Sequence, residues 1–380
     1  CYLLCLTGLL GVVVTGDAFN LFVFLEISSL SSYVLISLGP TRRALTAAYQ
    51  YLVMGTIGAT FILIGIGLLY MMTGTLNMLD ISQRLPDVAD TRTIRVAFAF
   101  VTVGVSIKLA LFPLHIWLPN AYTYAPSVVS AFMAATATKV GVYVLLRFFF
   151  TLFGLQFSFY AMHVGEILML LAVAAMLIAS LVAIFQDNVK RMLAYSSVAN
   201  VGYIVLAIGL APTASQGLTP ALMHILNHAL IKGAMFMAAC AFIYKLDLGD
   251  TRDYVGIGRT MPFSCLAFIL AALAMIGLPP GAGFVSKWYL ILAALETGKY
   301  IFVGVIFTST LLMIVYFWRV IEIMYIRIPE NIDTRIDTTA VNEIPLSMLA
   351  PLMALAILTF IIGFMWISGS FNPFLEAVNA

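Results

Sequence analysis

Long runs of apolar residues, separated by short polar stretches, dominate the pattern along this chain. Eleven of these runs read as membrane-spanning helices, counting an incomplete first one, because a span needs about 20 mostly apolar residues. The runs exceed strand length and do not alternate, so closed barrels of strands are excluded. The pattern predicts an all-α polytopic membrane protein with segments at roughly 1–16, 18–38, 48–73, 96–121, 126–149, 163–184, 189–211, 219–244, 261–296, 299–327 and 345–370.

Two of these segments contain residues that interrupt a helix. Pro113 and Pro119 fall within segment 96–121, and the sequence GLPPGAG at 277–283 falls within segment 261–296. Proline lacks a backbone N–H and frees a carbonyl one turn earlier. Freed groups at membrane depth need water or side chains. Each break therefore predicts a polar, hydrated spot inside the membrane.

Composition supports the membrane assignment and limits the partners, cofactors and reactions to be expected. The chain is 63% hydrophobic and 9% charged, whereas soluble domains carry about 25% charged residues. A net charge of +2 gives no reason to expect nucleic acid as a partner. The four cysteines lack metal-ligand spacing, and no flavin, iron–sulfur or nucleotide motif is present. We expect no metal, no cofactor and no redox or hydrolytic site in this chain.

Lysine and arginine in the loops predict the orientation, because cytoplasmic loops are enriched in both. Nine of these residues fall on one side and five on the other. The first side is therefore expected to be cytoplasmic and the C-terminus to lie outside. The larger group comprises Arg42, Arg43, Lys190, Arg191, Lys245, Arg252, Arg259, Arg327 and Arg335, and the smaller one Arg84, Arg92, Arg95, Arg147 and Lys299.

Several ionisable residues lie inside the apolar segments. A charge at the bilayer centre costs at least ~2.5–3.5 kcal/mol, so such residues are paired, hydrated or functional. Structural ion pairs and snorkelling side chains are the alternative, but snorkelling suits helix ends rather than central positions. For His224, one turn into its segment, the structural alternative is favoured, and the serines near Glu26 are assigned to helix packing. The central candidates for proton transfer are Glu26, Lys108, Lys139, His228, Lys232 and Lys287.

The two breaks also indicate an internal repeat. Lys108 and Lys287 flank them, and at nearly the same spacing QYLVMGTIG (50–58) aligns with HALIKGAMF (228–236). An odd number of segments separates the two lysines, so the copies are expected to be inverted, as in many transporters. We predict a first repeat at 1–150 with an incomplete first helix, a second repeat at 160–328, and a charged loop with a C-terminal helix at 329–380.

Five motifs cover most of the chain: FNLFVFLEISSLSSYVL (19–35), SIKLALFPLHIWLPNAYTYAPSVVSAFMAATATKVGVYVLLR (106–147), QDNVKRMLAYSSVANVGYI (186–204), HILNHALIKGAMFM (224–237) and GLPPGAGFVSKW (277–288). Together they resemble a known family, the antiporter-like membrane subunits. This family is shared by Mrp-type multisubunit cation/proton antiporters, membrane-bound hydrogenases and respiratory complex I. Within it, the glutamate helix and Lys139 look most like the D subunit of Mrp antiporters.

The resemblance implies a core of fourteen helices with two inverted five-helix repeats, of which this chain would hold the fourth to the fourteenth. The chain lacks an initiator methionine and is expected to be truncated at its N-terminus. Glu26 and Lys108 would form an ion pair, and Lys139 would bridge it to His228 and Lys232. Lys287 would end this polar axis near the second break.

Three functional hypotheses follow. The first is a proton-translocating subunit of a Na⁺/H⁺ antiporter in a bacterial inner membrane, with other membrane subunits, the lipid bilayer, protons and Na⁺ as partners. The second is the same fold in a complex I-type NADH–quinone oxidoreductase or a hydrogenase, with redox groups in partner subunits. The third is a structural scaffold. Two departures argue against two equivalent channels: Met54 aligns with Lys232, and Glu26 has no carboxylate counterpart in 189–211.

Overall fold

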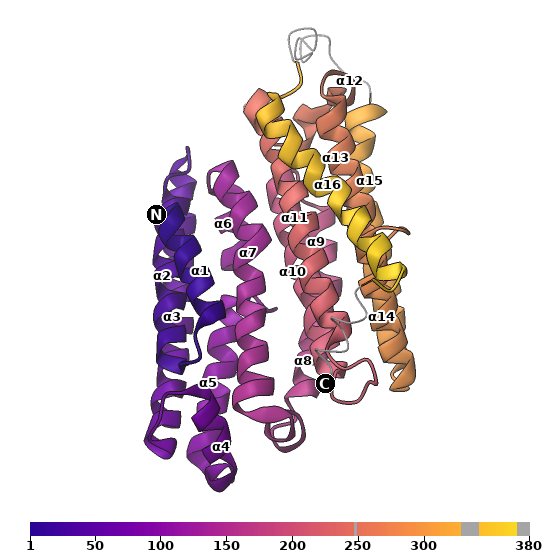
Figure 1. The fold of residues 1–380 in the computed structure, drawn as a ribbon. Coiled ribbons are helices and arrows are strands. Elements are labelled where there is room, and N and C mark those ends of the chain that lie inside the picture. The colour runs from indigo at the N-terminus through magenta and orange to yellow at the C-terminus, as the bar shows by residue number, and fades with distance from the viewer. Residues whose placement is uncertain (247–248, 328–341, 371–380) are drawn as a thin grey trace. The chain divides into compact units, whose positions relative to one another are not determined.

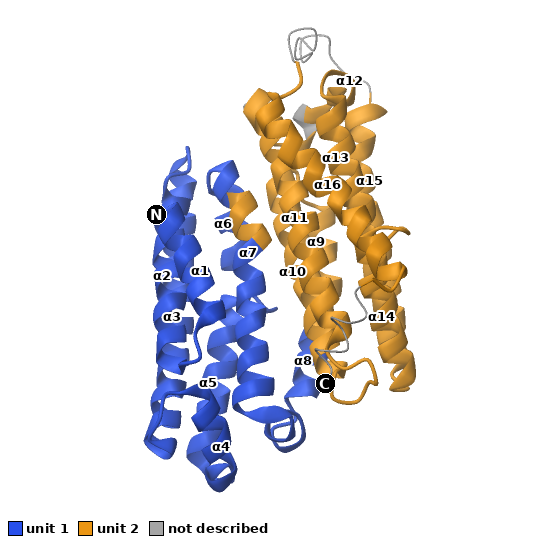
Figure 2. Ribbon diagram, viewed as in Figure 1, with its two compact units in different colours: residues 1–129, 136–171 blue, residues 130–135, 172–380 orange. Residues whose placement is uncertain are grey.

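The computed structural model describes residues 1–246, 249–327 and 342–370. Regular structure in these ranges is helical, with sixteen α-helices, short π-helical and 3-10 segments, and two isolated β-bridges. The predicted all-α fold class is therefore confirmed. The contacts divide the chain into two compact units, one of residues 1–129 and 136–171, the other of residues 130–135 and 172–380 (Figure 2).

Eight described helices are long and apolar enough to cross a membrane, and each matches one of the eleven predicted segments. The other three predictions are the first segment, whose helix has 13 residues, and the two broken segments. A break leaves pieces shorter than the hydrocarbon thickness requires. The eight spans are Ala18–Ser37, Arg42–Thr73, Ser127–Leu152, Val164–Ile184, Val189–Leu210, Thr219–Leu246, Tyr300–Tyr325 and Leu346–Ile367.

In the first unit, α2 packs against α1 and α3, and α3 packs along α5 (Figure 1). Polar side chains cap two of these helices: Asp17 accepts from Asn20 N at the start of α2, and Thr91 accepts from Ile94 N at the start of α5. Such caps satisfy backbone N–H groups that have no partner within the helix. The helices are α1 (Tyr2–Val14), α2 (Ala18–Ser37), α3 (Arg42–Thr73), α4 (Met78–Val88), α5 (Arg92–Lys108), α6 (Trp117–Tyr124) and α7 (Ser127–Leu146), then π-helical Arg147–Leu152 and Gln156–Ala161, and α8 (Val164–Ala174).

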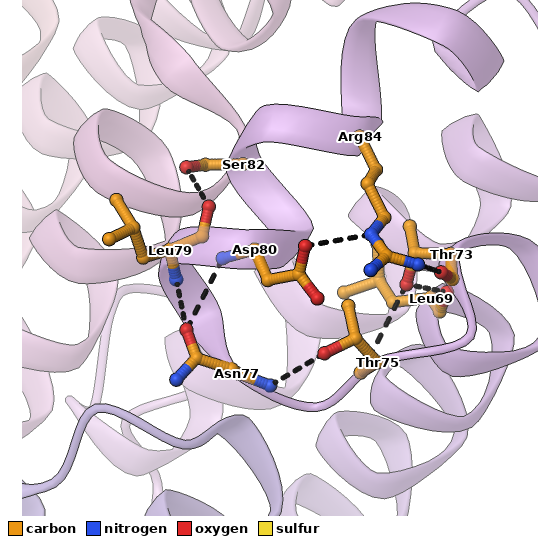
Figure 3. Close-up of polar contacts among 8 residues, drawn as sticks. All are labelled: Leu69, Thr73, Thr75, Asn77, Leu79, Asp80, Ser82 and Arg84. Carbon is orange, nitrogen blue, oxygen red and sulfur yellow. Dashed lines mark hydrogen bonds and ion pairs between the residues drawn. The ribbon is translucent and has the colours of Figure 1, made fainter.

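The turn between α3 and α4 is held by polar contacts (Figure 3). Gly74, with φ of 71°, ends α3 in the left-handed conformation that glycine adopts without strain. Asn77 caps α4 by accepting from the backbone N–H groups of Leu79 and Asp80. Arg84 donates to Asp80 Oδ1 at 2.7 Å and to the Thr73 carbonyl at 3.1 Å. One arginine therefore ties the first turn of α4 to the last turn of α3.

This contact is expected to depend on pH. Arg84, and to a smaller degree Thr75, hold the pKa of Asp80 below its usual value. A lowered carboxyl pKa means that the contact is complete above the usual aspartate pKa and is lost as pH falls through the lowered value. Hydrogen exchange of α4, corrected for the intrinsic rates, should show this loss of protection on acidification. Asp80→Asn should remove the pH step, and an unchanged step in that variant would refute the assignment.

In the second unit, α11 packs against α10, α13, α14 and α16, and α16 crosses these helices obliquely (Figure 1). Helix α10 is buried along almost its whole length. It therefore presents side chains to neighbours on every face. The elements are π-helical Ala175–Ala179, α9 (Ser180–Ile184), α10 (Val189–Leu210), α11 (Thr219–Leu246), 3-10 Thr251–Tyr254, α12 (Ile257–Thr260), α13 (Pro262–Ile276), α14 (Ala282–Glu296), α15 (Tyr300–Tyr325) and α16 (Leu346–Ile367).

The two units share one local feature. An isolated antiparallel bridge joins Asp17, before α2, to Asn77, after α3. A second bridge joins Asn188, before α10, to Asp250, after α11. This correspondence agrees with the predicted internal repeat, and both the repeat and its boundaries remain a prediction. Most of the predicted charged loop, together with the last ten residues and the predicted external C-terminus, lies outside the described residues.

Candidate functional site

The first part of the site is an ion pair at the end of α5. Lys108 is the last residue of that helix, and its Nζ donates to Glu26 Oε1 at 2.8 Å. The two side chains are 5% and 21% exposed, so the pair is largely removed from solvent. Helix C-termini carry partial negative charge, which favours a cation there. The structure thus brings together two of the predicted residues, from α2 and α5.

Lys108 has a second acceptor in the Ser29 hydroxyl, whose Oγ also lies 2.8 Å from Nζ. From the sequence alone, the serines of this helix are expected to serve in packing. Ser28, Ser31 and Ser32 fit that assignment, because each donates to a carbonyl of its own helix. Ser29 does not, since it contacts the ammonium group directly. The lysine can therefore leave the carboxylate without losing both of its acceptors.

The first break is held by an aromatic side chain. Trp117, at the start of α6, donates from Nε1 to the Ile107 carbonyl at 2.9 Å. Its ring stacks on Tyr51 of α3, with the centroids 3.9 Å apart and the planes within 7°. Leu111 N closes a further bond to the Ser106 carbonyl. These contacts satisfy carbonyls that a continuous helix would have used, directly beside Lys108.

Lys139 lies on α7 and is 8% exposed. Helix α7 lies close to the first break at Gly141. A Cβ atom added to this glycine would lie only 3.0 Å from Leu109 Cα. Leu109 is the residue after Lys108. The structure therefore places Glu26, Lys108 and Lys139 in the same compact unit.

The second break places Lys287 against the end of α13. Gly277, with φ of 95°, ends that helix. Nζ of Lys287 then donates to the carbonyls of Met275 and Ile276, both at 3.0 Å. It also lies 4.9 Å from the centre of the Tyr203 ring, within range of a cation–π interaction. The last turn of α13 and an aromatic face thus stabilise this buried ammonium group.

Lys232 is completely buried on α11. Its Nζ donates to the Leu193 carbonyl at 2.8 Å and to Ser196 Oγ at 2.9 Å, both on α10. Tyr316 of α15 donates to the same serine oxygen at 3.1 Å. Ser196 therefore accepts from the lysine and the tyrosine, which joins α10, α11 and α15 through one hydroxyl group.

The two histidines of α11 stack with their ring centres 6.0 Å apart. His224 lies with Nδ1 2.9 Å from Ser286 Oγ and Nε2 3.2 Å from Asn200 Oδ1. Asn200 donates from Nδ2 to the Ser196 carbonyl, so its Oδ1 accepts from the imidazole N–H. His224, for which the sequence favoured a structural role, is thus a hydrogen-bonded link between α10 and α14.

Within the second unit, neutral polar residues that were not selected from the sequence contact the buried lysines and His224. Ser196, Asn200 and Tyr203 lie on one face of α10 because their spacing is four and three residues. Thr310 of α15 lies 3.3 Å from the Tyr203 hydroxyl and accepts from Lys287 at 3.5 Å. Their helical spacing inside an apolar segment is the sequence signal that could have identified them. His228, Lys232 and Lys287 all belong to this unit.

Comparison with known proteins gives the family. Residues 15–313 match the family described as NADH:quinone oxidoreductase/Mrp antiporter, TM. The chain belongs to this family. The resemblance drawn from the sequence motifs is therefore confirmed, and the chain is an integral membrane protein with multiple candidate spans.

Three similar proteins illustrate this family. The N subunit of the NADH-quinone oxidoreductase of Desulforudis audaxviator is 46% identical over 369 residues, 95% of this chain and 73% of the relative. The D subunit of the Na⁺/H⁺ antiporter of Alkalihalophilus pseudofirmus is 30% identical over 363 residues, covering 96% and 71%. A chain in the structure of the Mrp complex from Dietzia sp. DQ12-45-1b matches with a TM-score of 0.86 and 26% identity, covering 99% of this chain and 76% of that chain. All three belong to multisubunit membrane proteins.

Proposed function

We propose that this chain is a proton-translocating membrane subunit of a multisubunit complex. The observation that carries the proposal is the Lys108–Glu26 pair beside a helix break, with Ser29 as an alternative acceptor. A buried ion pair that only stabilised the fold would gain little over apolar residues of similar volume. A lysine between two acceptors can instead change partner, and a change of partner alters how readily the lysine releases a proton.

We propose that the proton path includes Lys139 and continues through His228, Lys232 and Lys287. Each transfer requires a donor and an acceptor in hydrogen-bond reach or joined by water. Helices are ~10 Å across, so side chains on neighbouring helices need intermediates. In the second unit, hydroxyl groups take such places: Ser196 contacts Lys232, and Thr310 contacts Lys287.

The complex that contains the chain is proposed from the comparisons. Identity of 46% to an NADH-quinone oxidoreductase subunit favours a complex I-type redox complex. A Na⁺/H⁺ antiporter of the Mrp type is the second candidate, supported by a relative at 30% identity and by the Mrp-like glutamate helix and Lys139. In both cases the partners are further membrane subunits. We place the complex in a bacterial inner membrane with the C-terminus outside.

Affinity purification of the tagged chain from its native host tests this proposal. The purified complex is expected to catalyse electron transfer to a quinone and to acidify proteoliposomes only while electrons flow. Proton movement driven by a Na⁺ gradient without electron transfer would instead establish the antiporter candidate. A complex that moves no protons in either assay would contradict both and favour the scaffold.

Lys139 is expected to tolerate a titratable replacement better than an apolar one. Histidine can still exchange protons, because its unperturbed pKa lies near neutrality. Lys139→His should therefore retain part of the proton transport, whereas Lys139→Ala should lose most of it, by roughly ten-fold or more. Proton uptake by inverted vesicles with equal amounts of assembled complex measures this. Equal rates for the two variants would show that residue 139 only packs.

A further inference from the structure

Tyr33 has a buried hydroxyl group beside the ion pair. The residue is 5% exposed, and its Oη makes no hydrogen bond of full geometry within the described part of the chain, although the Ser29 side chain lies near enough to act on it. Tyr33 follows Ser29 by four residues and Glu26 by seven, so the three share one face of α2. The Glu26 carboxylate and the Ser29 hydroxyl are polar groups that act on it. Buried hydroxyl groups normally have a partner, so this one calls for an explanation.

The position of the tyrosine is fixed by its neighbours. Its ring meets Tyr51 edge to face, with the centroids 4.6 Å apart. On α3, a Cβ at Gly55 would lie only 2.0 Å from the Tyr33 hydroxyl oxygen. Glycine at this position therefore leaves the space that the hydroxyl group fills. Tyr51 and Gly55 together hold the Tyr33 hydroxyl oxygen next to the Lys108 site.

The hydrogen bonds of Ser29 indicate a role for the Tyr33 hydroxyl oxygen. A charged lysine has only donors, so Ser29 Oγ accepts from Lys108. The hydrogen of Ser29 then needs an acceptor of its own. Unlike Ser28, Ser31 and Ser32, Ser29 donates to no helix carbonyl among the described contacts. The Tyr33 oxygen, one turn away on the same face, is the acceptor that this arrangement offers.

We propose that Tyr33 is a positioning residue for the proton on Lys108. Its oxygen accepts the Ser29 hydrogen while Lys108 is charged. When Lys108 gives up a proton, the neutral amine gains a lone pair, the Ser29 hydroxyl turns to donate to it, and Tyr33 loses that bond. The proposal rests on the proposed function in proton transport. The titratable groups around Tyr33 and the Tyr51 ring that it meets are Glu26 and Lys108, Tyr122 from α6 and Cys5 from α1.

Tyr33→Phe tests this directly, because phenylalanine keeps the ring against Tyr51 and removes only the oxygen. Without that acceptor, the charged state of Lys108 is less stable. The alkaline limb of the pH–rate profile of proton transport should move to lower pH by about half to one pH unit, as one hydrogen bond of typical strength produces. The assay uses native membrane vesicles that contain the whole complex, with the rate at the optimum largely retained.

Further variants separate this role from simple packing. If Tyr33 acts through Ser29, adding Tyr33→Phe to Ser29→Ala should cause no additional shift. Gly55→Ala should reproduce the shift by displacing the hydroxyl group. Gly67→Ala on the same helix is the matched control, because a Cβ there meets nothing within 4 Å.

Two results would overturn the Tyr33 proposal: an unchanged profile in Tyr33→Phe, or fully additive shifts in the double variant. An inactive Glu26→Gln variant beside an unchanged Tyr33→Phe profile would reject the role of Tyr33 and leave the proposed function intact. Normal transport in Glu26→Gln would reject the proposed function itself.

Discussion

Lys108→Ala is expected to reduce proton transport by roughly 10²-fold or more, the scale of a lost acid–base group. The amine is the group that would take and release the proton, and no other cation is seen to contact Glu26 in the described part of the chain. Glu26→Gln should be similarly inactive, because the amide cannot attract the ammonium group as a carboxylate does. Proton uptake by inverted vesicles measures both effects against the amount of assembled complex.

Assembly needs its own control, because removing one partner of a buried pair leaves an uncompensated charge. The subunit content of each variant complex should equal that of the unmodified complex. Lys299→Ala is a matched substitution, since this lysine precedes α15 and lies outside the candidate spans. Wild-type rates are expected for Lys299→Ala. Wild-type rates for Lys108→Ala would remove the pair from the mechanism.

Lys232→Met is expected to cause a loss of similar size. Methionine fills much of the volume of the lysine stem, so the packing of α11 is largely kept while the amine is removed. Ser196 still accepts from Tyr316 in this variant, so its oxygen keeps a partner. The repeat alignment also places Met54 at the corresponding position of α3, which shows that methionine suits such a helix. Transport should therefore fall by roughly 10²-fold with normal assembly.

Ser196→Ala is a milder variant with which Lys232→Met can be compared. Alanine at 196 removes one acceptor of Lys232 but leaves the Leu193 carbonyl, so a partial loss is expected. The ranking should be unmodified protein, then Ser196→Ala, then Lys232→Met, with initial rates of proton uptake as the measurement. A fully active Lys232→Met complex would mean that the amine serves packing alone.

Much of the fold follows from the sequence because membrane spans depend on long apolar runs. Pro113 marked the first break and the prolines and glycines of 277–283 marked the second, and the structure divides the helices at both places. Helix α4, Met78–Val88, is absent from the predicted segments because its composition is polar and its stability comes from a cap and contacts with α3. Breaks and spans are local properties of the sequence, whereas α4 depends on tertiary contacts.

The site was predictable to the extent that it consists of charges in apolar surroundings. Lys108 and Glu26 lie far apart in sequence, and the resemblance to a known family paired them before the structure did. Neutral partners such as Ser29 and Asn200 carry a weaker sequence signal, because serine and asparagine inside a membrane also bond to their own helix. Only the geometry shows that Ser29 contacts an ammonium group and that Asn200 contacts an imidazole.

The central claim is that protons pass through ionisable side chains of this chain, beginning with the Glu26–Lys108 pair. The most direct test is proton uptake by vesicles containing the double variant Glu26→Gln/Lys108→Met. This variant removes both charges together, so no uncompensated charge is left to disturb the fold. The account predicts a complex that assembles normally and transports almost no protons. Proton transport at the unmodified rate in that double variant would contradict it.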